Sequence, residues 1–253
     1  MNKEELIKVY ADTKNIGSNL PKPDSAKYID VSSFGEMYCR QMEGNVIVEP
    51  MDTVSALIKY SNRENTKNYQ KSNAVLNMAS SKRKGGGVEN GSMAQEECLF
   101  RCSNLFNIPD SFYPILQKEF VYTHNAKFFK DSYYNHITPI AAGVITMPAI
   151  NLNKNHMDNI QNQDSTDNYE DIMIEKIEKM FNIASFHLFD NIILGAWGCG
   201  VFKNDPLVIA NMFNKVIEKK RMSFDNIVFA VINDTNSVAN NYQIFSDNIK
   251  TKF

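Results

Sequence analysis

Two adjacent carboxylates, Glu96 and Glu97, are the residues of this sequence best placed to do chemistry. They follow Gln95, and seven residues separate Gln95 from the sequence Gly85-Gly86-Gly87, called here the glycine triplet. A carboxyl group can protonate a leaving group and then activate water. Side chains of neighbouring helical residues point about 100° apart, so the two acids cannot share one role. Paired acids alone usually form a solvated face; the nearby triplet favours a catalytic role.

Two glycine-rich segments are expected to follow a buried strand and to precede a helix. The triplet comes after residues 74–78, and the segment Gly195-Ala196-Trp197-Gly198-Cys199-Gly200, called here the second glycine loop, comes after residues 191–194. In open α/β sheets, ligands bind beyond the carboxyl ends of strands. Glycines there let backbone N–H groups approach phosphate closely, and a helix N-terminus adds its dipole. Each loop alone is also consistent with a tight turn.

The other reactive side chains show no metal-binding or nucleophile pattern. The four histidines lack ligand spacing, and no CxxC motif is present. Cys98 and Cys102, four residues apart, are expected to be small core residues, and Trp197 is expected to brace the second glycine loop. We therefore predict no metal site.

Residues 73–106 resemble the signature of poly(ADP-ribose) glycohydrolases, and in particular their microbial-type branch. This stretch combines a strand of the type VLN-x-AS, the glycine triplet, Gln95-Glu96-Glu97 and a segment like CxRxSxL. Residues 122–131, 194–202 (LGAWGCGVF) and 229–231 match further family segments in the same order. Together, the matching segments span roughly residues 45–235.

The resemblance implies a macrodomain-like fold, that is, a three-layer α/β/α arrangement with a mixed central sheet. It implies hydrolysis of the ribose–ribose O-glycosidic bond to release ADP-ribose, without a metal or a diffusible cofactor. Glu97 would be the general acid/base and Glu96 would hold ribose hydroxyls beside the scissile bond. The other implied contacts are with the diphosphate and the distal ribose. They involve Asn77, Gly85, Gly86, Gly87, Gln95, Gly195, Gly198, Cys199, Gly200, Val201 and Phe202.

Three features depart from the family pattern. Lys84 stands where many relatives have proline, which predicts a less rigid entry to the glycine triplet. The first 40 residues match no segment of the family. The Asn-rich stretch 151–168 is interpreted as an inserted, exposed loop.

The elements that must position these residues alternate between strands and helices. We expect strands at 45–49, 74–78, 120–129, 143–147, 191–194 and 227–232, and loops at 22–27 and 61–72. Helices are expected at 2–17, from Asp52 or Thr53 to about Tyr60, from about Ser92 through Phe106, after a cap at Asp164, Ser165 or Thr166, from Asp205-Pro206, and at the C-terminal end. Strands that are apolar on both faces predict a sheet covered on both sides and at least partly parallel.

Composition limits the class of protein. With 253 residues, 43% of them hydrophobic, the chain is interpreted as a single domain (1–253) with an N-terminal helical extension at about 1–40. The balance of 27 Lys and Arg against 29 Asp and Glu argues against direct nucleic-acid binding. The sequence shows no signal peptide and no membrane-spanning run. We expect a soluble intracellular protein, cytoplasmic, or nuclear if eukaryotic.

Two alternatives to a poly(ADP-ribose) glycohydrolase stay open. One is a non-catalytic ADP-ribose reader, which the retention of both acids disfavours. The other is a hydrolase of another ADP-ribose derivative, either a mono-ADP-ribosyl group on protein or nucleic acid or a signalling nucleotide. The motifs suit ADP-ribose and not what is attached to it. The expected partner is therefore poly(ADP-ribose) or ADP-ribosylated protein as substrate, with no membrane partner.

Overall fold

A mixed β-sheet forms the centre of the molecule in the computed structural model, which describes residues 1–31, 44–61, 71–153, 168–220, 223–233 and 240–251. The strands lie in the order β1-β4-β5-β3-β6-β7-β2. They are β1 Asp24–Tyr28, β2 Asn45–Glu49, β3 Asn73–Asn77, β4 Phe120–Lys130, β5 His136–Thr146, β6 Asn191–Leu194 and β7 Asn226–Ala230. The pairs β1–β4 and β4–β5 are antiparallel and the others are parallel.

Six α-helices accompany the sheet in the described part of the chain: α1 Lys3–Gly17, α2 Thr53–Ser61, α3 Gln95–Cys102, α4 Tyr169–Phe186, α5 Pro206–Lys220 and α6 Asn241–Asn248. All of them except α3, which follows Ala94, start after an Asn or Asp residue that caps the helix. Asn2 accepts from the Glu5 amide, and Asp52 accepts from the Ser55 amide. None of the described helices has the length and apolar character needed to cross a lipid bilayer.

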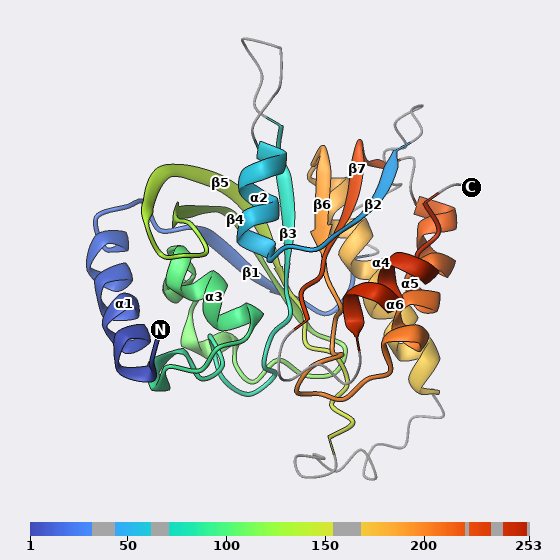
Figure 1. Cartoon of the computed structure of the whole chain (residues 1–253), viewed down its shortest axis with the longest axis horizontal. Coiled ribbons are helices and arrows are strands. Elements are labelled where there is room, and N and C mark those ends of the chain that lie inside the picture. The colour runs from blue at the N-terminus through green and yellow to red at the C-terminus, as the bar shows by residue number, and fades with distance from the viewer. Residues whose placement is uncertain (32–43, 62–70, 154–167, 221–222, 234–239, 252–253) are drawn as a thin grey trace.

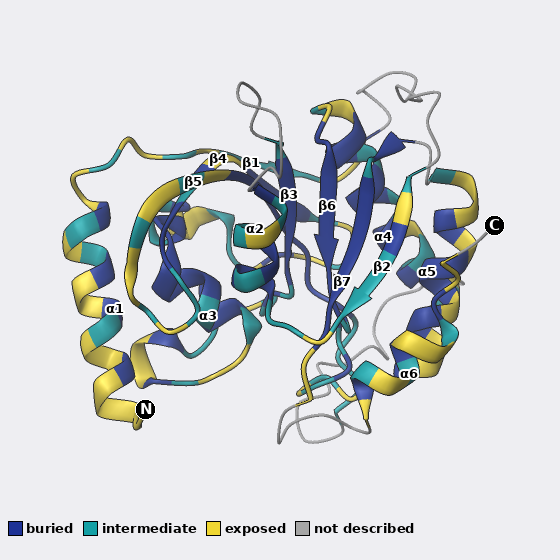
Figure 2. Cartoon of the chain, turned by 45° about the horizontal axis from the view of Figure 1, so that its top comes forward, coloured by how far each residue is buried: buried dark blue, intermediate teal, exposed yellow. Residues whose placement is uncertain are grey.

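The helices form two layers, one on each face of the sheet (Figure 1). Side chains of successive strand residues point to opposite faces, so each central strand contributes to two hydrophobic clusters. In β3, Leu76 belongs to the cluster beneath α4, α5 and α6, whereas Val75 belongs to the cluster beneath α1, α2 and α3. Figure 2 shows the central strands buried, with exposed residues on the outer sides of the helices. The predicted three-layer α/β/α macrodomain-like fold is confirmed.

An asparagine begins each of four neighbouring parallel strands, and their side chains form a ladder at the amino end of the sheet. The register aligns Asn73 with Asn191, Asn191 with Asn226, and Asn226 with Asn45. Asn191 donates to Asn73 Oδ1 over 2.9 Å and accepts from Asn226 Nδ2 over 2.7 Å. Asn45 Nδ2 lies 3.2 Å from Asn226 Oδ1. These side-chain bonds tie the four strands together at the end opposite the glycine loops.

Several boundaries differ from those predicted. Residues 24–28 form edge strand β1 rather than part of a loop; the two prolines lie before the strand, where no ladder donor is needed. Strand β5 begins at His136 rather than Gly143, because its first half is the exposed arm of a hairpin and lacks a buried apolar run. Helix α4 is capped by Asn168 rather than by Asp164, Ser165 or Thr166, and most of the predicted loops 61–72 and 151–168 lies outside the described residues.

Helix α3 is shorter than predicted. It begins at Gln95 rather than near Ser92, because the backbone of Ala94 is extended, with φ of −133° and ψ of −178°. It ends at Cys102, and residues 105–107 form a separate 3₁₀ turn. Both glutamates therefore lie in the first turn of α3.

Two boundaries near the C-terminal end also differ from those predicted. Strand β7 ends at Ala230 rather than at residue 232, and α6 ends at Asn248 rather than at the C-terminus.

Candidate active site

The two glycine segments meet because β3 and β6 are adjacent and parallel. Parallel strands end at the same edge of a sheet, so the segment after Asn77 and the segment after Leu194 leave the sheet side by side. The exit of β5, the other neighbour of β3, lies at the same edge. The predicted site residues are thus brought to one edge of the sheet, the location where open α/β folds bind ligands.

Gln95 attaches the start of α3 to the end of β3. Its amide oxygen accepts from the Met78 N–H over 2.9 Å, and its amide nitrogen donates to the Leu76 carbonyl over 2.6 Å and to Thr53 Oγ1 over 3.2 Å. The Gln95 side chain therefore behaves like a further strand residue paired with β3. Its hydrogen-bonding atoms are engaged with protein atoms, which gives it a positioning role towards Glu96 and Glu97.

Glu96 is nearly fully buried, with 4% of its surface exposed. Its Oε2 atom accepts from the Ser80 N–H over 2.7 Å, and Oε1 lies 3.4 Å from Asn77 Nδ2. Burial, aided by the negative charge of Glu97, raises the pKa of Glu96 to about 8 despite these donors. Asn77 also donates to Thr146 Oγ1, and its buried Oδ1 atom has no hydrogen-bond partner among the described residues.

Glu97 is held between two backbone amides. Oε1 accepts from the Gly87 N–H over 2.8 Å, and Oε2 accepts from the Ala94 N–H over 3.0 Å. Its side chain is 7% exposed. The two amides come from the two ends of the turn between the glycine triplet and α3, so the shape of this turn sets the orientation of the Glu97 carboxylate.

The glycine triplet lets both carboxylates approach the loop. A Cβ atom on Gly86 would lie 2.5 Å from Glu97 Oε1 and 3.1 Å from Glu96 Oε2, so the two acids converge on this residue. Gly86 also has φ of 58°, which favours glycine. Cβ atoms on Gly85 and Gly87 would instead meet Phe100 and Ser92. Packing of the loop on α3 thus requires the triplet, and the phosphate approach that the sequence suggested stays a prediction.

Lys84 does not loosen the entry to the glycine triplet, contrary to our expectation. Its ammonium group donates to the carbonyl oxygens of Phe106 and Ile108 over 3.0 and 2.8 Å, and it lies 2.6 Å from Asp110 Oδ1. Three acceptors hold the side chain against the segment after α3. The lysine therefore fixes the loop by hydrogen bonds where a proline would restrict the backbone.

The second glycine loop is fastened to the exit of β5. Trp197 is fully buried and donates from Nε1 to the Met147 carbonyl over 2.9 Å, which confirms its bracing role. Asn204 donates to the Ile150 and Gly198 carbonyls over 2.9 and 3.1 Å and accepts from the Tyr169 hydroxyl. Gly198 has φ of 78° and packs directly on Asn204.

The remaining predicted residues of this loop differ in accessibility. Cys199 is fully buried, burial raises the pKa of its thiol, and its backbone N–H donates to the Ala196 carbonyl over 3.1 Å. A Cβ on Gly195 would meet the Ala230 carbonyl and Met78, whereas a Cβ on Gly200 would meet no atom within 4 Å. Val201 is exposed, and the Phe202 carbonyl accepts from the Leu152 N–H over 2.9 Å.

Several residues that shape the site carried little signal in the sequence. Ser80 and Thr146 act through one amide and one hydroxyl that only the fold brings to Glu96 and Asn77. The Tyr113 hydroxyl is buried without a partner among the described residues, and burial and the charge of Glu96 raise its pKa. Among the described residues, no group of three His, Cys, Asp or Glu side chains could hold a metal ion.

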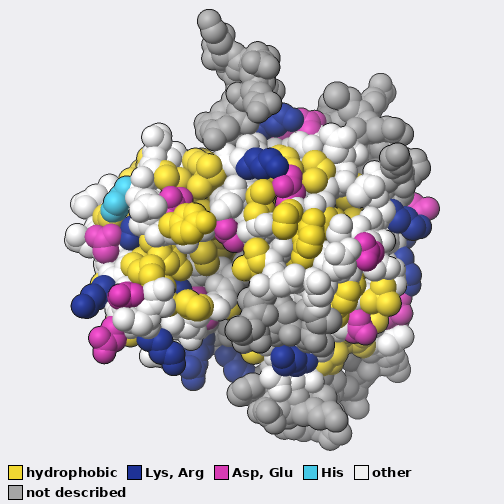
Figure 3. Space-filling view, viewed as in Figure 1, with side chains coloured by type: hydrophobic (Ala, Val, Ile, Leu, Met, Phe, Trp, Pro, Cys, Tyr) yellow, Lys and Arg dark blue, Asp and Glu magenta, His cyan; other side chains and the backbone are white. Residues whose placement is uncertain are grey.

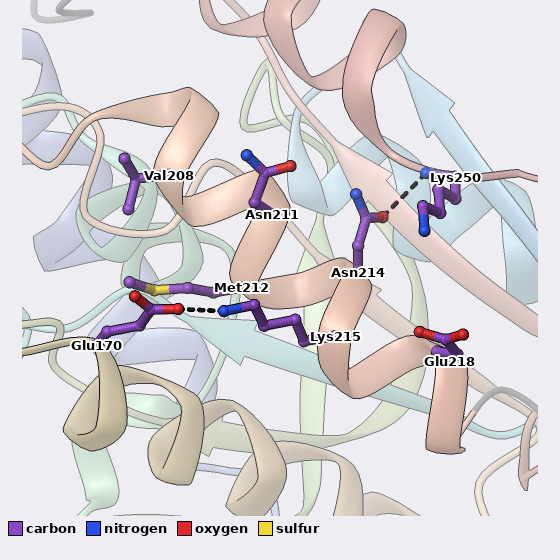
Figure 4. A pocket seen from close by; sticks show the side chains of 8 residues that line it. All are labelled: Glu170, Val208, Asn211, Met212, Asn214, Lys215, Glu218 and Lys250. Atoms are coloured by element: carbon purple, nitrogen blue, oxygen red, sulfur yellow. Dashed lines mark hydrogen bonds and ion pairs between the residues drawn. The ribbon is translucent and has the colours of Figure 1, made fainter.

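A separate cavity of about 470 Å³ lies away from this site, beside α5, the start of α4 and the C-terminal segment (Figure 4). An ion pair between Glu170 and Lys215 crosses it, and Asn214 Oδ1 accepts from the Lys250 N–H over 2.9 Å. None of the predicted site residues lines this cavity. This cavity is therefore separate from the candidate active site, which the two glycine loops, Glu96 and Glu97 form.

Comparison with known proteins places this arrangement in a family. The family described as "Microbial-type PARG, catalytic domain" matches residues 9–139, more than half of the chain. The chain belongs to the microbial-type PARG family. The match includes β3, the glycine triplet and both glutamates of α3. It also includes residues 9–40, so our expectation that the first 40 residues match no segment of the family is wrong for most of them. None of the curated proteins with which the chain was compared matches it.

Solved PARG structures share the fold of the whole chain. Poly(ADP-ribose) glycohydrolase from Thermomonospora curvata superposes with a TM-score of 0.78 at 22% identity, over 97% of this chain and 99% of that one. The same enzyme bound to the inhibitor ADP-HPD gives 0.75 at 22% identity, over 96% and 99%. A mutant of the Deinococcus radiodurans enzyme in complex with ADP-ribose gives 0.74 at 21% identity, over 95% and 97%. The PARG family fold therefore extends beyond the residues that the family match covers.

Proposed function

We propose that this protein is a poly(ADP-ribose) glycohydrolase that cleaves the ribose–ribose O-glycosidic bond and releases ADP-ribose. The observation that carries the proposal is that Glu96 and Glu97 converge on Gly86. They do so at the edge of the sheet where the second glycine loop leaves β6. Membership of the PARG family supports the same reaction. Deinococcus radiodurans PARG, which shares the fold, has been solved in complex with ADP-ribose, and this supports ADP-ribose as the kind of ligand.

Glu97 is proposed as the general acid and base. Cleavage of a glycosidic C–O bond passes through an oxocarbenium-like state, which needs a proton on the leaving oxygen. Glu97 donates that proton as the bond breaks. Its carboxylate then takes a proton from the water that adds to the ribose carbon, which restores the acid. The Gly87 and Ala94 amides fix the carboxyl group during both steps.

Glu96 and Asn77 are proposed to hold the ribose beside the scissile bond. Both lie at the end of β3, and the free Oδ1 atom of Asn77 can accept from a ribose hydroxyl. The raised pKa of Glu96 leaves this group mainly neutral at pH 7, so the pair of acids does not carry two negative charges. A polyanionic substrate is therefore less strongly repelled than two ionised carboxylates would imply.

The second glycine loop is proposed to bind the diphosphate through its backbone. Gly198, Gly200 and Val201 would supply amides, and the buried Cys199 would hold the loop between them. Phe202 would lie near the terminal ribose, and Gly195 would shape the start of the loop. The buried Cys199 thiol and the Asn204 contacts favour backbone rather than side-chain binding. Because carboxyl groups and amides carry this chemistry, a chelator is expected to leave turnover unchanged.

The proposal is tested by comparing products from three substrates: poly(ADP-ribose), mono-ADP-ribosylated protein and ADP-ribosylated nucleic acid. We expect free ADP-ribose from the polymer. Release only from a singly modified substrate would instead indicate a hydrolase of another ADP-ribose derivative. Binding of ADP-ribose without release from any of the three would indicate a reader.

A further inference from the structure

Helix α1 and the catalytic turn are joined by Arg101, a residue that the mechanism above does not use. Arg101 is fully buried on α3, one helical turn after Glu97. Its Nη2 atom donates to the Ser92 carbonyl over 2.6 Å, and its Nε atom lies 3.3 Å from the Leu6 carbonyl of α1. One guanidinium group therefore bridges the N-terminal helix and the turn that precedes α3.

Ser92 lies within the turn that carries both ligands of Glu97. This turn runs from Gly87, whose amide binds Oε1, to Ala94, whose amide binds Oε2. The Ser92 N–H also donates to the Gly87 carbonyl over 3.2 Å, which closes the turn. A contact that fixes Ser92 thus fixes the separation of the two amides that orient the catalytic carboxylate.

Helix α1 contacts the same turn at two more places and contacts α3 at a third. The Lys3 carbonyl packs on Gly91, where a Cβ atom would lie only 2.6 Å from it, and Lys14 pairs with Glu89 over 3.0 Å. The Thr13 hydroxyl donates to the Arg101 carbonyl over 2.5 Å. Residues at both ends of α1 therefore contact the segment between the glycine triplet and α3.

We propose that Arg101, held against α1, is a positioning residue of the reaction: it keeps the turn between Gly87 and Ala94 in the geometry that orients Glu97. This inference rests on the proposed function, and it gives the N-terminal helix a role in catalysis. A planar guanidinium can reach two carbonyl oxygens at once from a fixed plane, whereas a lysine ammonium is a single point charge on a flexible stem. Arg101→Lys is therefore expected to keep the charge but lose the bridge.

Lys130 offers a matched control. It is a second buried cation that holds α1, donating to the Val9 carbonyl over 3.2 Å, to Asp12 over 2.7 Å and to Thr13 over 2.9 Å. None of these contacts involves the turn that carries the Gly87 and Ala94 amides. Lys130→Met should thus loosen the later half of α1, where Val9, Asp12 and Thr13 lie, and leave the contacts of Arg101 with Leu6 and Ser92 in place.

The experiment measures kcat and KM on poly(ADP-ribose), the melting temperature, and amide hydrogen exchange in the wild type, Arg101→Lys and Lys130→Met. A displaced catalytic group can cost about 100-fold in rate, so we expect kcat of Arg101→Lys to fall by about 10- to 100-fold with a smaller change in KM. Exchange of residues 85–94 should quicken in this variant. Lys130→Met should keep kcat within about threefold below its melting transition, with faster exchange confined to α1.

The inference is overturned if kcat follows melting temperature equally in both variants, or if exchange of residues 85–94 is unchanged in Arg101→Lys. The exchange readout separates this inference from the proposed function. A wild type that does not cleave the polymer would contradict the proposed function. Faster exchange of residues 85–94 in Arg101→Lys would still show that Arg101 positions the turn.

Discussion

Gly86 has no side chain and so leaves room for the carboxyl groups of Glu96 and Glu97 to approach the same point. Glu96 and Glu97 diverge by about 100° around α3, yet oxygen atoms of both lie near the position that a Gly86 Cβ would occupy. Their environments differ: Glu97 bonds to the loop through the Gly87 and Ala94 amides, and Glu96 bonds to the Ser80 amide after β3. Different partners allow adjacent acids to take different roles.

Gly200 gives the sharpest residue-scale test of backbone binding in the second glycine loop. Among the described residues, no atom beyond Gly200 and its two chain neighbours lies within 4 Å of a Cβ placed there, so Gly200→Val should change the free energy of unfolding by less than about 0.5 kcal/mol. If the loop backbone approaches the diphosphate, the new side chain should lower ADP-ribose affinity by about tenfold or more. Thermal unfolding and calorimetry measure the two effects.

Gly198→Val is the control for this loop, since Gly198 has φ of 78° and packs on Asn204. It should lower both stability and affinity. Unchanged ADP-ribose affinity in Gly200→Val would contradict the proposed approach of this loop to the ligand.

Glu96 should leave a pH signature in the stability of the protein. Its pKa is raised from 4.5 to about 8 in the folded state, so between these values the folded protein keeps a proton that the unfolded chain releases. Stability from this group is complete below pH 4.5 and is lost as pH rises towards 8. Between pH 6 and pH 8.5, the free energy of unfolding of the wild type should fall by on the order of 2 kcal/mol more than that of Glu96→Gln.

Urea denaturation of both proteins at the two pH values measures this difference. Subtracting the change in the variant from the change in the wild type removes contributions from other groups, such as Lys176, whose pKa burial lowers to about 8. Parallel pH profiles for the two proteins would show that the Glu96 pKa is not raised.

At the scale of elements, the amino ends of the strands carry a stabilising feature apart from the site. Asn191 is fully buried and bonded to both Asn73 and Asn226. Asn191→Leu would leave a buried acceptor and a buried donor unpaired, so we expect a loss of about 2–4 kcal/mol in the free energy of unfolding. Asn45→Ala, at the exposed end of the ladder, should cost less than about 0.5 kcal/mol. Equal losses in urea denaturation would contradict the ladder.

The strands that could be predicted are those buried on both faces. Residues 74–76 and 192–194 are continuous apolar runs, and the structure places β3 and β6 within one residue of the predicted bounds 74–78 and 191–194. Strand β1 and the first half of β5 are exposed edge or hairpin segments, which lack such a run. The asparagine ladder could not be predicted from the sequence either, because it depends on the register of four strands that are distant in the sequence.

The site shows the same division between local and tertiary information. The glycine triplet and Gln95-Glu96-Glu97 lie within one short segment, so their spacing predicted the loop and the helix that carry them. Asn204 and Arg101 act on carbonyl oxygens far along the chain, at Ile150 and Leu6. No local pattern predicts which carbonyl a side chain will reach, so the supporting contacts required the structure.

At the scale of the whole molecule, we propose that the expected N-terminal extension belongs to the same domain as the site. Strand β1 pairs with β4, and α1 packs on the turn before α3. On the face seen in Figure 3, Lys and Arg side chains and Asp and Glu side chains are both spread over the surface. This mixed surface favours local recognition of a polyanion by the two loops over attraction by a large basic field.

The central claim is that Glu97 performs the chemistry while Glu96 holds the substrate, and the two glutamine variants test it directly. At least two N–H donors surround each side chain, so Glu97→Gln and Glu96→Gln disturb similar contacts and keep the size of the side chain. The measurement is turnover of poly(ADP-ribose) together with affinity for ADP-ribose in both variants. Glu97→Gln should lower turnover by at least about 10²–10⁴-fold while keeping or improving affinity, and Glu96→Gln should lose both. Near-normal turnover in Glu97→Gln, or indistinguishable variants, would contradict this division of roles.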